Sequence, residues 1–340
     1  MTVATALVTG NEVSPHLAEL AVKQALARAG LTRAEGVVLL LSQHFTRHAD
    51  SAVLAAARAA GCMQIVGMTA PGLITEQGWS LDQVGAAALV LGDEIGLTPI
   101  HDGQGHAITF CATPTLPKDW LASPAHIGLL HDGSAVWQQG RVQDDGRCHF
   151  GFHCVSARPL VATGLKCIGP LQTVSTTRGL DLLRVDTLSA VESLQRALPA
   201  DWKKRSPLPV HHLASIPEGD LERPAIPLLA ANADGSITLA QMPEPGQQFC
   251  WALRQPLAAE AELRTLLQDT PAPEFALMFS CIGRGPLFYG NDDHDLAVWR
   301  ERFPDVPLLG AYGSAQIAPA RKNGSEQWQN SVVLALCARK

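Results

Sequence analysis

The sequence predicts an α+β protein with two related halves, each a mixed β-sheet with helices packed on it. Short apolar runs, such as residues 36–41 and 275–279, are bounded by turn-forming residues, as strands buried on both faces are. Elsewhere apolar residues recur every three or four positions, the spacing of a helix with one buried face. Residues 98–186 instead alternate short strand patterns with Gly, Pro and Asp turns, so this part is expected to be mostly β.

The N-terminal half begins with a strand at 3–8 and a helix whose ends are marked by the sequence. Ser14 is placed to cap this helix, Pro15 fits its first position and Gly30 fits its end. Further strands are expected at 36–41, 65–67, 85–91, 107–111, 126–130, 135–139, 148–155 and 180–185, helices at 50–60 and 188–198, and a Gly-rich loop at 68–79.

The C-terminal half is organised around residues 275–319. A buried strand is expected to end in a loop at 280–285, and a helix capped by Asp292 or Asp293 should follow. A second strand, 306–312, leads into a loop at 313–316, and the last strand is expected at 332–337. This unit places polar side chains at the ends of strands, where ligands tend to bind in α/β sheets.

The two halves carry similar patterns. Residues 36–91 run through strand, loop, helix, strand, Gly-rich loop and strand, and the C-terminal half repeats that order. Residues 67–72 would then correspond to 310–315, and 85–91 to 331–337. A duplication explains this similarity, but so does the general likeness of strand–helix–strand units. With a duplication, the two loops could face one another and share a cleft.

Residues 201–225 are rich in proline and charge, and we expect a connector there. The predicted domains are therefore 1–200 and 226–340. A chain of 340 residues with 46% hydrophobic residues is large enough for two well-packed cores.

Composition argues against several classes of partner. The formal net charge is −6 and no basic stripe is present, which disfavours nucleic acid. The apolar runs are too short to span a bilayer, and the N-terminus lacks the basic residues of a secretory signal. Eight cysteines show no CxxC spacing, and Cys111, Cys281 and Cys337 lie in apolar segments as reduced, buried cysteines do. A cytoplasmic location is expected.

The loop after the strand 275–279 holds the main candidate ligand-binding residues. Arg284 lies between Gly283 and Gly285, so its guanidinium suits a carboxylate or phosphate and the backbone can approach a ligand. The alternative is an ion pair with one of the aspartates at 292, 293 or 295. Cys281 is a weaker candidate for a nucleophile, because a buried cysteine at a strand end is the commoner arrangement. Tyr312 and Gln316 end the next strand and would orient a polar group.

This stretch resembles the FIST family, a two-part sensory module of bacterial signalling proteins that also occurs in some eukaryotic F-box proteins. The matching segments are 279–285, 306–313 and Asn330 in the C-terminal half, and 67–72 with 75–79 in the N-terminal half. The resemblance covers about residues 36–338. One departure is Ala315-Gln316-Ile317-Ala318, where family members usually carry Gly-Glu-Ile-Gly, so a role that needs a carboxylate at Gln316 is in doubt.

The resemblance implies a stand-alone cytoplasmic module for signal transduction that senses a small ligand, with amino acids or similar carboxylate metabolites proposed as ligands and a signalling protein as a possible partner. It implies no known catalytic reaction and no cofactor. In the N-terminal loop, Thr69, Gly72, Thr75 and Glu76 could contact the ligand or serve local turn chemistry.

Two other functions stay open. A hydrolase- or transferase-like enzyme would use Cys281 or Arg284 and needs a base near the sulfur, although a non-enzymatic role is favoured. A protein-interaction module would need no small ligand. The segment 148–154 contains two Cys and two His, but alternate strand residues point to opposite faces, so we predict no metal site there.

Overall fold

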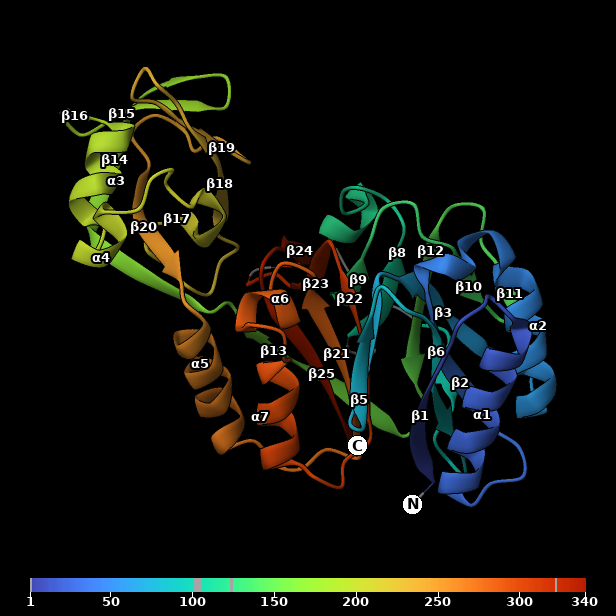
Figure 1. The fold of residues 1–340 in the computed structure, drawn as a ribbon. Coiled ribbons are helices and arrows are strands. Elements are labelled where there is room, and N and C mark those ends of the chain that lie inside the picture. The colour runs from blue at the N-terminus through green and yellow to red at the C-terminus, as the bar shows by residue number, and fades with distance from the viewer. Residues whose placement is uncertain (1, 101–105, 123–124, 322) are drawn as a thin grey trace. The chain divides into compact units, whose positions relative to one another are not determined.

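The computed structural model describes residues 2–100, 106–122, 125–321 and 323–340 (Figure 1). The chain divides into two compact units. The first unit contains residues 1–162 and 263–340, and the second contains residues 163–262. Each is described by itself.

The described residues of the first unit form three six-stranded sheets. The first sheet has the order β1 (Val3–Gly10), β6 (Val84–Leu91), β2 (Gly36–Ser42), β3 (Ile65–Ala70), β10 (Val136–Gln138) and β11 (Arg141–Val142). The second has the order β13 (Val155–Ala162), β25 (Val332–Arg339), β21 (Phe275–Cys281), β22 (Leu308–Gly313), β4 (Gly72–Thr75) and β5 (Gly78–Leu81). The third has the order β7 (Leu97–Thr98), β12 (Arg147–Phe152), β8 (Ala107–Cys111), β9 (His126–Leu130), β23 (Ala315–Pro319) and β24 (Ser325–Trp328).

The three sheets are built on one plan. Each has a parallel pair at its centre, β2–β3, β21–β22 or β8–β9, joined by a crossover that contains a helical segment. These segments are η1 (Gln43–His48) with α2 (Ala49–Ala60), α6 (Pro286–Tyr289) with α7 (His294–Arg302), and η2 (Lys118–Leu121). An antiparallel strand, β6, β25 or β12, flanks each pair on one side. The predicted α+β class with mixed sheets in two related halves is confirmed, and the structure adds a third copy.

The other side of each parallel pair is occupied by a hairpin from a different copy. The hairpin β4–β5 follows β3 in the chain but pairs with β22, and β23–β24 follows β22 but pairs with β9. The hairpin β10–β11 follows β9 and pairs with β3, which closes the cycle. The predictions of loops at 68–79 and at 313–316 are therefore wrong. Both stretches contain strands whose partners lie far away in the sequence.

A glycine at one repeated position shows that the copies correspond residue by residue. Gly67, Gly128 and Gly310 occupy the same register, each opposite a residue of the first strand of its parallel pair. A Cβ at these positions would lie 1.7, 1.9 and 2.2 Å from the carbonyl oxygen of that opposite residue. Only glycine fits such a close approach of two backbones. The register also confirms the predicted correspondence of residues 67–72 with 310–315.

Alternate residues of the three parallel pairs meet in one shared core, as the strand period of two requires. These residues are Val38, Leu40, Val66, Met68, Ile108, Phe110, Ile127, Leu129, Leu277, Phe279, Leu309 and Ala311. The opposite faces pack against helices. The helices α1 (Pro15–Ala29) and α2 cover the first sheet, and α7 with the end of α5 (Pro256–Gln268) covers the second (Figure 1).

The second unit is a small β-barrel. Its strands run β14 (Leu165–Arg178), β20 (Gln248–Arg254), β17 (Leu213–Pro217), β18 (Ile226–Ala231), β19 (Ile237–Leu239) and β15 (Asp181–Val185), and β15 pairs back with β14. The short β16 (Leu188–Ser189) pairs with β15, and the remaining helical segments are α3 (Ala190–Ala197), α4 (Ala200–Lys203) and η3 (Val210–His212). The expected connector, 201–225, contains β17 of this barrel. The domain bounds 1–200 and 226–340 stay a prediction.

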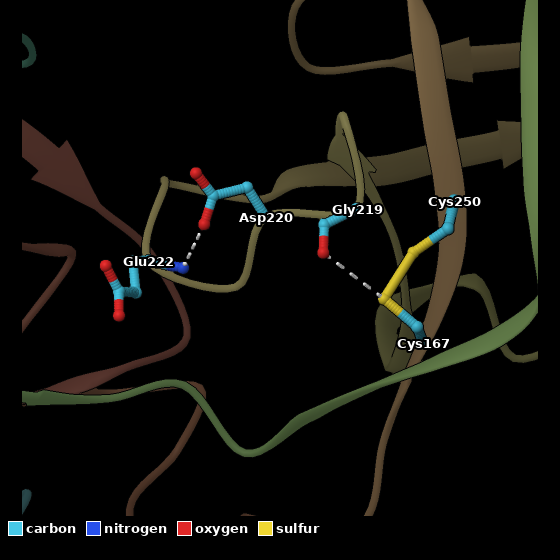
Figure 2. Close-up of a disulfide and its surroundings, with 5 residues drawn as sticks. All are labelled: Cys167, Gly219, Asp220, Glu222 and Cys250. Atoms are coloured by element: carbon cyan, nitrogen blue, oxygen red, sulfur yellow. Dashed lines mark hydrogen bonds between the residues drawn. A yellow bond between two sulfur atoms is a disulfide. The ribbon is translucent and has the colours of Figure 1, made fainter.

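The two ends of the second unit meet at one carboxylate. Glu262 accepts hydrogen bonds from the backbone amides of Thr163 and Gly164, at 3.2 and 2.5 Å. Within the barrel, Cys167 of β14 and Cys250 of β20 form a disulfide, and Gly219 O lies 4.0 Å from Cys167 Sγ (Figure 2). This disulfide was not predicted from the sequence, while Cys111, Cys281 and Cys337 are free and buried as expected.

Candidate functional site

The strand ends of the first unit define the candidate site. Within each parallel pair both strands end at the same edge, so the edge collects the loops that follow them. The ends of β22 and β9 are joined directly, because Ser314 donates a hydrogen bond from its backbone N to Leu130 O at 3.0 Å. The end of β21 is joined to β22, because Ile282 N donates to Gly313 O at 2.8 Å.

Cys281 occupies the end of β21 at this edge. Its side chain is 4% exposed, and its sulfur lies 3.7 Å from Ser314 O and 4.0 Å from Asn330 Oδ1. Gly283 is exposed beside it, and a Cβ there would come within 2.8 Å of Asn330 Oδ1. A thiol, an amide and a glycine backbone therefore lie together, two of them from the predicted set.

Gln316 places an amide in the apolar centre of the unit. It pairs with Leu129, which faces the shared core, whereas the corresponding hairpin positions in the other copies are held by Leu73 and Val136. Its side chain is fully buried, and Ser331 Oγ donates to its Oε1 at 2.9 Å. Among the described residues, its Nε2 has no hydrogen-bond partner. Leaving a buried donor unpaired costs about 1–3 kcal/mol, so the unpaired Nε2 marks Gln316 as a candidate binding group.

Gln316 is coupled to Cys281 through one residue. Ser331 donates its hydroxyl to Gln316, and its carbonyl oxygen accepts a hydrogen bond from the backbone N of Cys281 at 2.9 Å. The predicted residues Cys281, Gly283 and Gln316 thus belong to one neighbourhood, together with Ser331 and Asn330. Sequence reasoning assigned Asn330 to a turn before the last strand and did not single out Ser331, which lies in an ordinary strand pattern.

His131 lies at the same strand-end edge, and the sequence did not indicate it. It follows directly after β9, at the position that Gly313 and Ala70 hold in the other copies. Burial lowers the pKa of this imidazole below its ordinary value, and among the described residues its Nδ1 has no hydrogen-bond partner. The sequence showed only a turn signal at Asp132-Gly133, and the position of this histidine became visible only through the three-copy register.

Arg284 lies behind this edge, in an ion pair. Its Nε and Nη2 donate to the two oxygens of Asp295 at 2.8 and 3.0 Å, and both side chains are 1% exposed. Tyr289 also donates its hydroxyl to Asp295, at 2.8 Å. The ion pair with a downstream aspartate, which the sequence left open as an alternative, is therefore present. Such a bidentate pair fixes the loop 282–285.

Tyr312 packs beside this ion pair. Its hydroxyl donates to Asp293, and a Cβ added at Gly72 or Gly285 would lie 2.7 or 2.8 Å from its ring. The two glycines therefore make room for the phenol ring. Burial, reinforced by the charge of Asp295, raises the pKa of Asp293 to about 6.

The remaining predicted residues have other partners. Thr69 accepts a hydrogen bond from the backbone N of Ala135 at 2.9 Å and so holds the turn before β10. Thr75 and Glu76 lie at the opposite end of β22, where Glu76 accepts a hydrogen bond from the backbone N of Leu308 at 3.0 Å. The six residues of β22 span about 16 Å, so the structure does not bring these two to the candidate site.

In the segment 148–154, Cys148 is buried and His149 is exposed, which agrees with the predicted alternation of faces. Burial raises the pKa of the Cys148 thiol far above its ordinary value. Across the described ranges, no group of three or more His, Cys, Asp or Glu side chains is arranged to hold a metal ion. Within the same ranges, no helix has the length and apolar composition of a membrane-spanning segment.

Comparison with known proteins supports the FIST resemblance. Residues 190–319 match the model of the FIST C domain, a domain associated with signal transduction, which confirms that resemblance in the C-terminal part. An uncharacterized protein of Mycobacterium bovis is 25% identical over 192 residues, which is 52% of this chain and 50% of the relative. An uncharacterized protein of Mycobacterium tuberculosis is 29% identical over 113 residues, or 32% and 29% of the two chains. The chain thus spans about half the length, or less, of these relatives.

Proposed function

We propose that this protein is a sensory module of signal transduction that binds a small polar metabolite, such as an amino acid or another carboxylate, at the strand-end site around Cys281 and Gln316. The unpaired amide of Gln316 carries the proposal. An amide N–H donates well to a carboxylate or carbonyl oxygen. Asn330 and the exposed backbone at Gly283 add polar groups at the same edge.

Arg284 has a positioning role in this proposal. Because its guanidinium is engaged by Asp295, it supports the loop 282–285 from behind and need not contact the ligand. Binding is favoured over thiol catalysis for a related reason. Among the described residues, the polar contacts of the Cys281 sulfur are a carbonyl and an amide oxygen, and neither is a general base. A cytoplasmic location and a signalling protein as partner belong to the same proposal.

The first test is a thermal-shift screen of the full chain against amino acids, organic acids and nucleotides. A ligand at 100 times its dissociation constant stabilises the folded state by about 2.7 kcal/mol. The Gln316→Leu variant should keep the fold, because the corresponding positions in the other copies already hold Leu73 and Val136. It should lose the shift caused by the ligand.

Gln195→Leu is the matched control, since this glutamine is exposed on α3 of the second unit. It should keep the full shift. A ligand that stabilises the Gln316→Leu variant as strongly as the parent would refute the site assignment. A shift by neutral apolar compounds alone would refute the ligand class.

A further inference from the structure

We propose that the first unit has a second binding site, a pocket for organic anions at the end opposite to Cys281. The pocket has a volume of about 780 Å³ and is lined by residues of β12 and β13, the stretch around Thr98, and Lys340. Because β25 runs antiparallel to β21 and pairs Cys337 with Phe275, its C-terminal end lies beside the first residue of β21. The seven residues of β21, about 20 Å, separate this end from Cys281.

The charge of the lining defines the ligand. The side chains of His106, His153 and Lys340 are basic, whereas none of the described lining residues has a carboxylate side chain. The formal net charge of the whole chain is −6, so the basic lining of this pocket is opposite in sign to the chain as a whole. An anion is therefore the complementary ligand.

The two histidines are held in place by the main chain. His106 Nδ1 lies 3.0 Å from Ala157 O, and His153 Nδ1 lies 3.0 Å from Glu94 O. A carbonyl oxygen only accepts hydrogen bonds, so in each ring Nδ1 carries a proton, and Nε2 donates to an anion when it is protonated as well. Such an anchor fixes the orientation of the ring, as the second nitrogen does in ligand-binding histidines.

The apolar part of the lining adds a requirement for the body of the ligand. Ile100, Phe152 and Val155 line the same cavity. A volume of this size falls in the range of about 300–1,000 Å³ that is common for small-molecule sites. The ligand class is therefore a carboxylate with an apolar or aromatic body, which the sensory proposal at Cys281 does not require.

The test compares naphthoate with its neutral carboxamide, which has the same aromatic body, by isothermal titration calorimetry on the full chain. Naphthoate should bind more tightly by about tenfold, as expected for a hydrogen bond to a charged group. Equal affinities would overturn the proposal, and so would a lack of binding by naphthoate.

A matched pair of variants locates the binding. Ser156 is exposed on β13 and lines the pocket, so Ser156→Glu adds a negative charge there and Ser156→Gln adds a neutral side chain of the same size. Ser156→Glu should weaken naphthoate binding about tenfold relative to Ser156→Gln, with the melting temperatures of both near that of the parent. Equal binding by the two variants would place the anion elsewhere and refute the pocket. Gln316→Leu should leave naphthoate binding unchanged, which separates this result from the sensory proposal.

Discussion

At the residue scale, Arg284 shows how burial changes the meaning of a motif. The sequence left two roles open for it, contact with a ligand and an ion pair with a downstream aspartate, and the structure shows a buried pair with Asp295. The local sequence indicated Arg284 and the downstream aspartates as possible partners. It did not indicate how the loop folds to bury them. The same limit applies to Gln316, whose unpaired amide follows from a hairpin that pairs with a distant strand.

Arg284→Ala is expected to lower the free energy of unfolding by about 3–5 kcal/mol, because it leaves the buried carboxylate of Asp295 uncompensated. Urea unfolding followed by tryptophan fluorescence measures this loss. Arg339→Ala is the control, since its pair with Glu274 has side chains 56% and 42% exposed and should contribute less than about 1 kcal/mol. Similar losses in the two variants would contradict the structural role of Arg284.

His126 should make stability depend on pH. Burial, and to a lesser degree the charge of His149, lowers its pKa from 6.5 to about 4. Between these values the unfolded chain binds the proton and the folded chain does not. The contribution of the neutral His126 to the free energy of unfolding, about 3 kcal/mol, is therefore present above pH 6.5 and is lost as the pH falls toward 4.

The raised pKa of Asp293 acts in the opposite direction over nearly the same range, so the whole-protein profile mixes both effects. The difference in melting temperature between the parent and His126→Gln at each pH isolates the contribution of the histidine. The melting temperature of the variant should fall less between pH 6.5 and pH 4. Parallel profiles for parent and variant would argue against this assignment.

At the scale of elements, most strands and helices were predictable and their partners were not. The strands β2, β21 and β25 are continuous apolar runs, and Ser14 caps α1 as expected, with its hydroxyl accepting from His16 N. The hairpins β4–β5 and β23–β24 were missed because their sequences are rich in glycine and polar residues. They become strands only through pairing with another copy, which no local pattern reveals.

The repeated glycine gives a prediction for single elements. Gly128→Ala would bring a Cβ within 1.9 Å of Thr109 O, so β8 and β9 must separate. We expect a loss of more than about 4 kcal/mol, or insoluble protein. Gly78→Ala is the control, because no atom lies within 4 Å of a Cβ at that position. A melting temperature close to that of the parent for Gly128→Ala would contradict the close approach of the strands.

The disulfide between β14 and β20 should stabilise the second unit. It joins residues 83 positions apart, and such a link typically contributes about 2–4 kcal/mol. A Cys167→Ser/Cys250→Ser variant should therefore melt at a lower temperature, and a reductant should lower the melting temperature of the parent but not of the variant. Cys62→Ser, at a free cysteine, is the control. If the reductant has no effect on the parent, the disulfide is absent in solution.

At the scale of the whole molecule, the exchange of hairpins joins the three copies of the first unit into one folding unit. Every sheet contains strands from two copies, so no copy can open without breaking the pairing of another. Hydrogen exchange should therefore show β2, β8 and β21 opening together, while the barrel of residues 163–262 exchanges on its own. Separate opening of the three parallel pairs would contradict this expectation.

The second unit is inserted in the chain between β13 and β21. Its two ends lie together, because Glu262 accepts hydrogen bonds from the amides of Thr163 and Gly164. A segment whose two ends meet in this way is an inserted domain that can be treated as a separate part. It can be cut out and bridged by a few residues, or exchanged for another domain, without moving either flank. For a protein engineer, that junction is the natural place to attach a reporter to this protein.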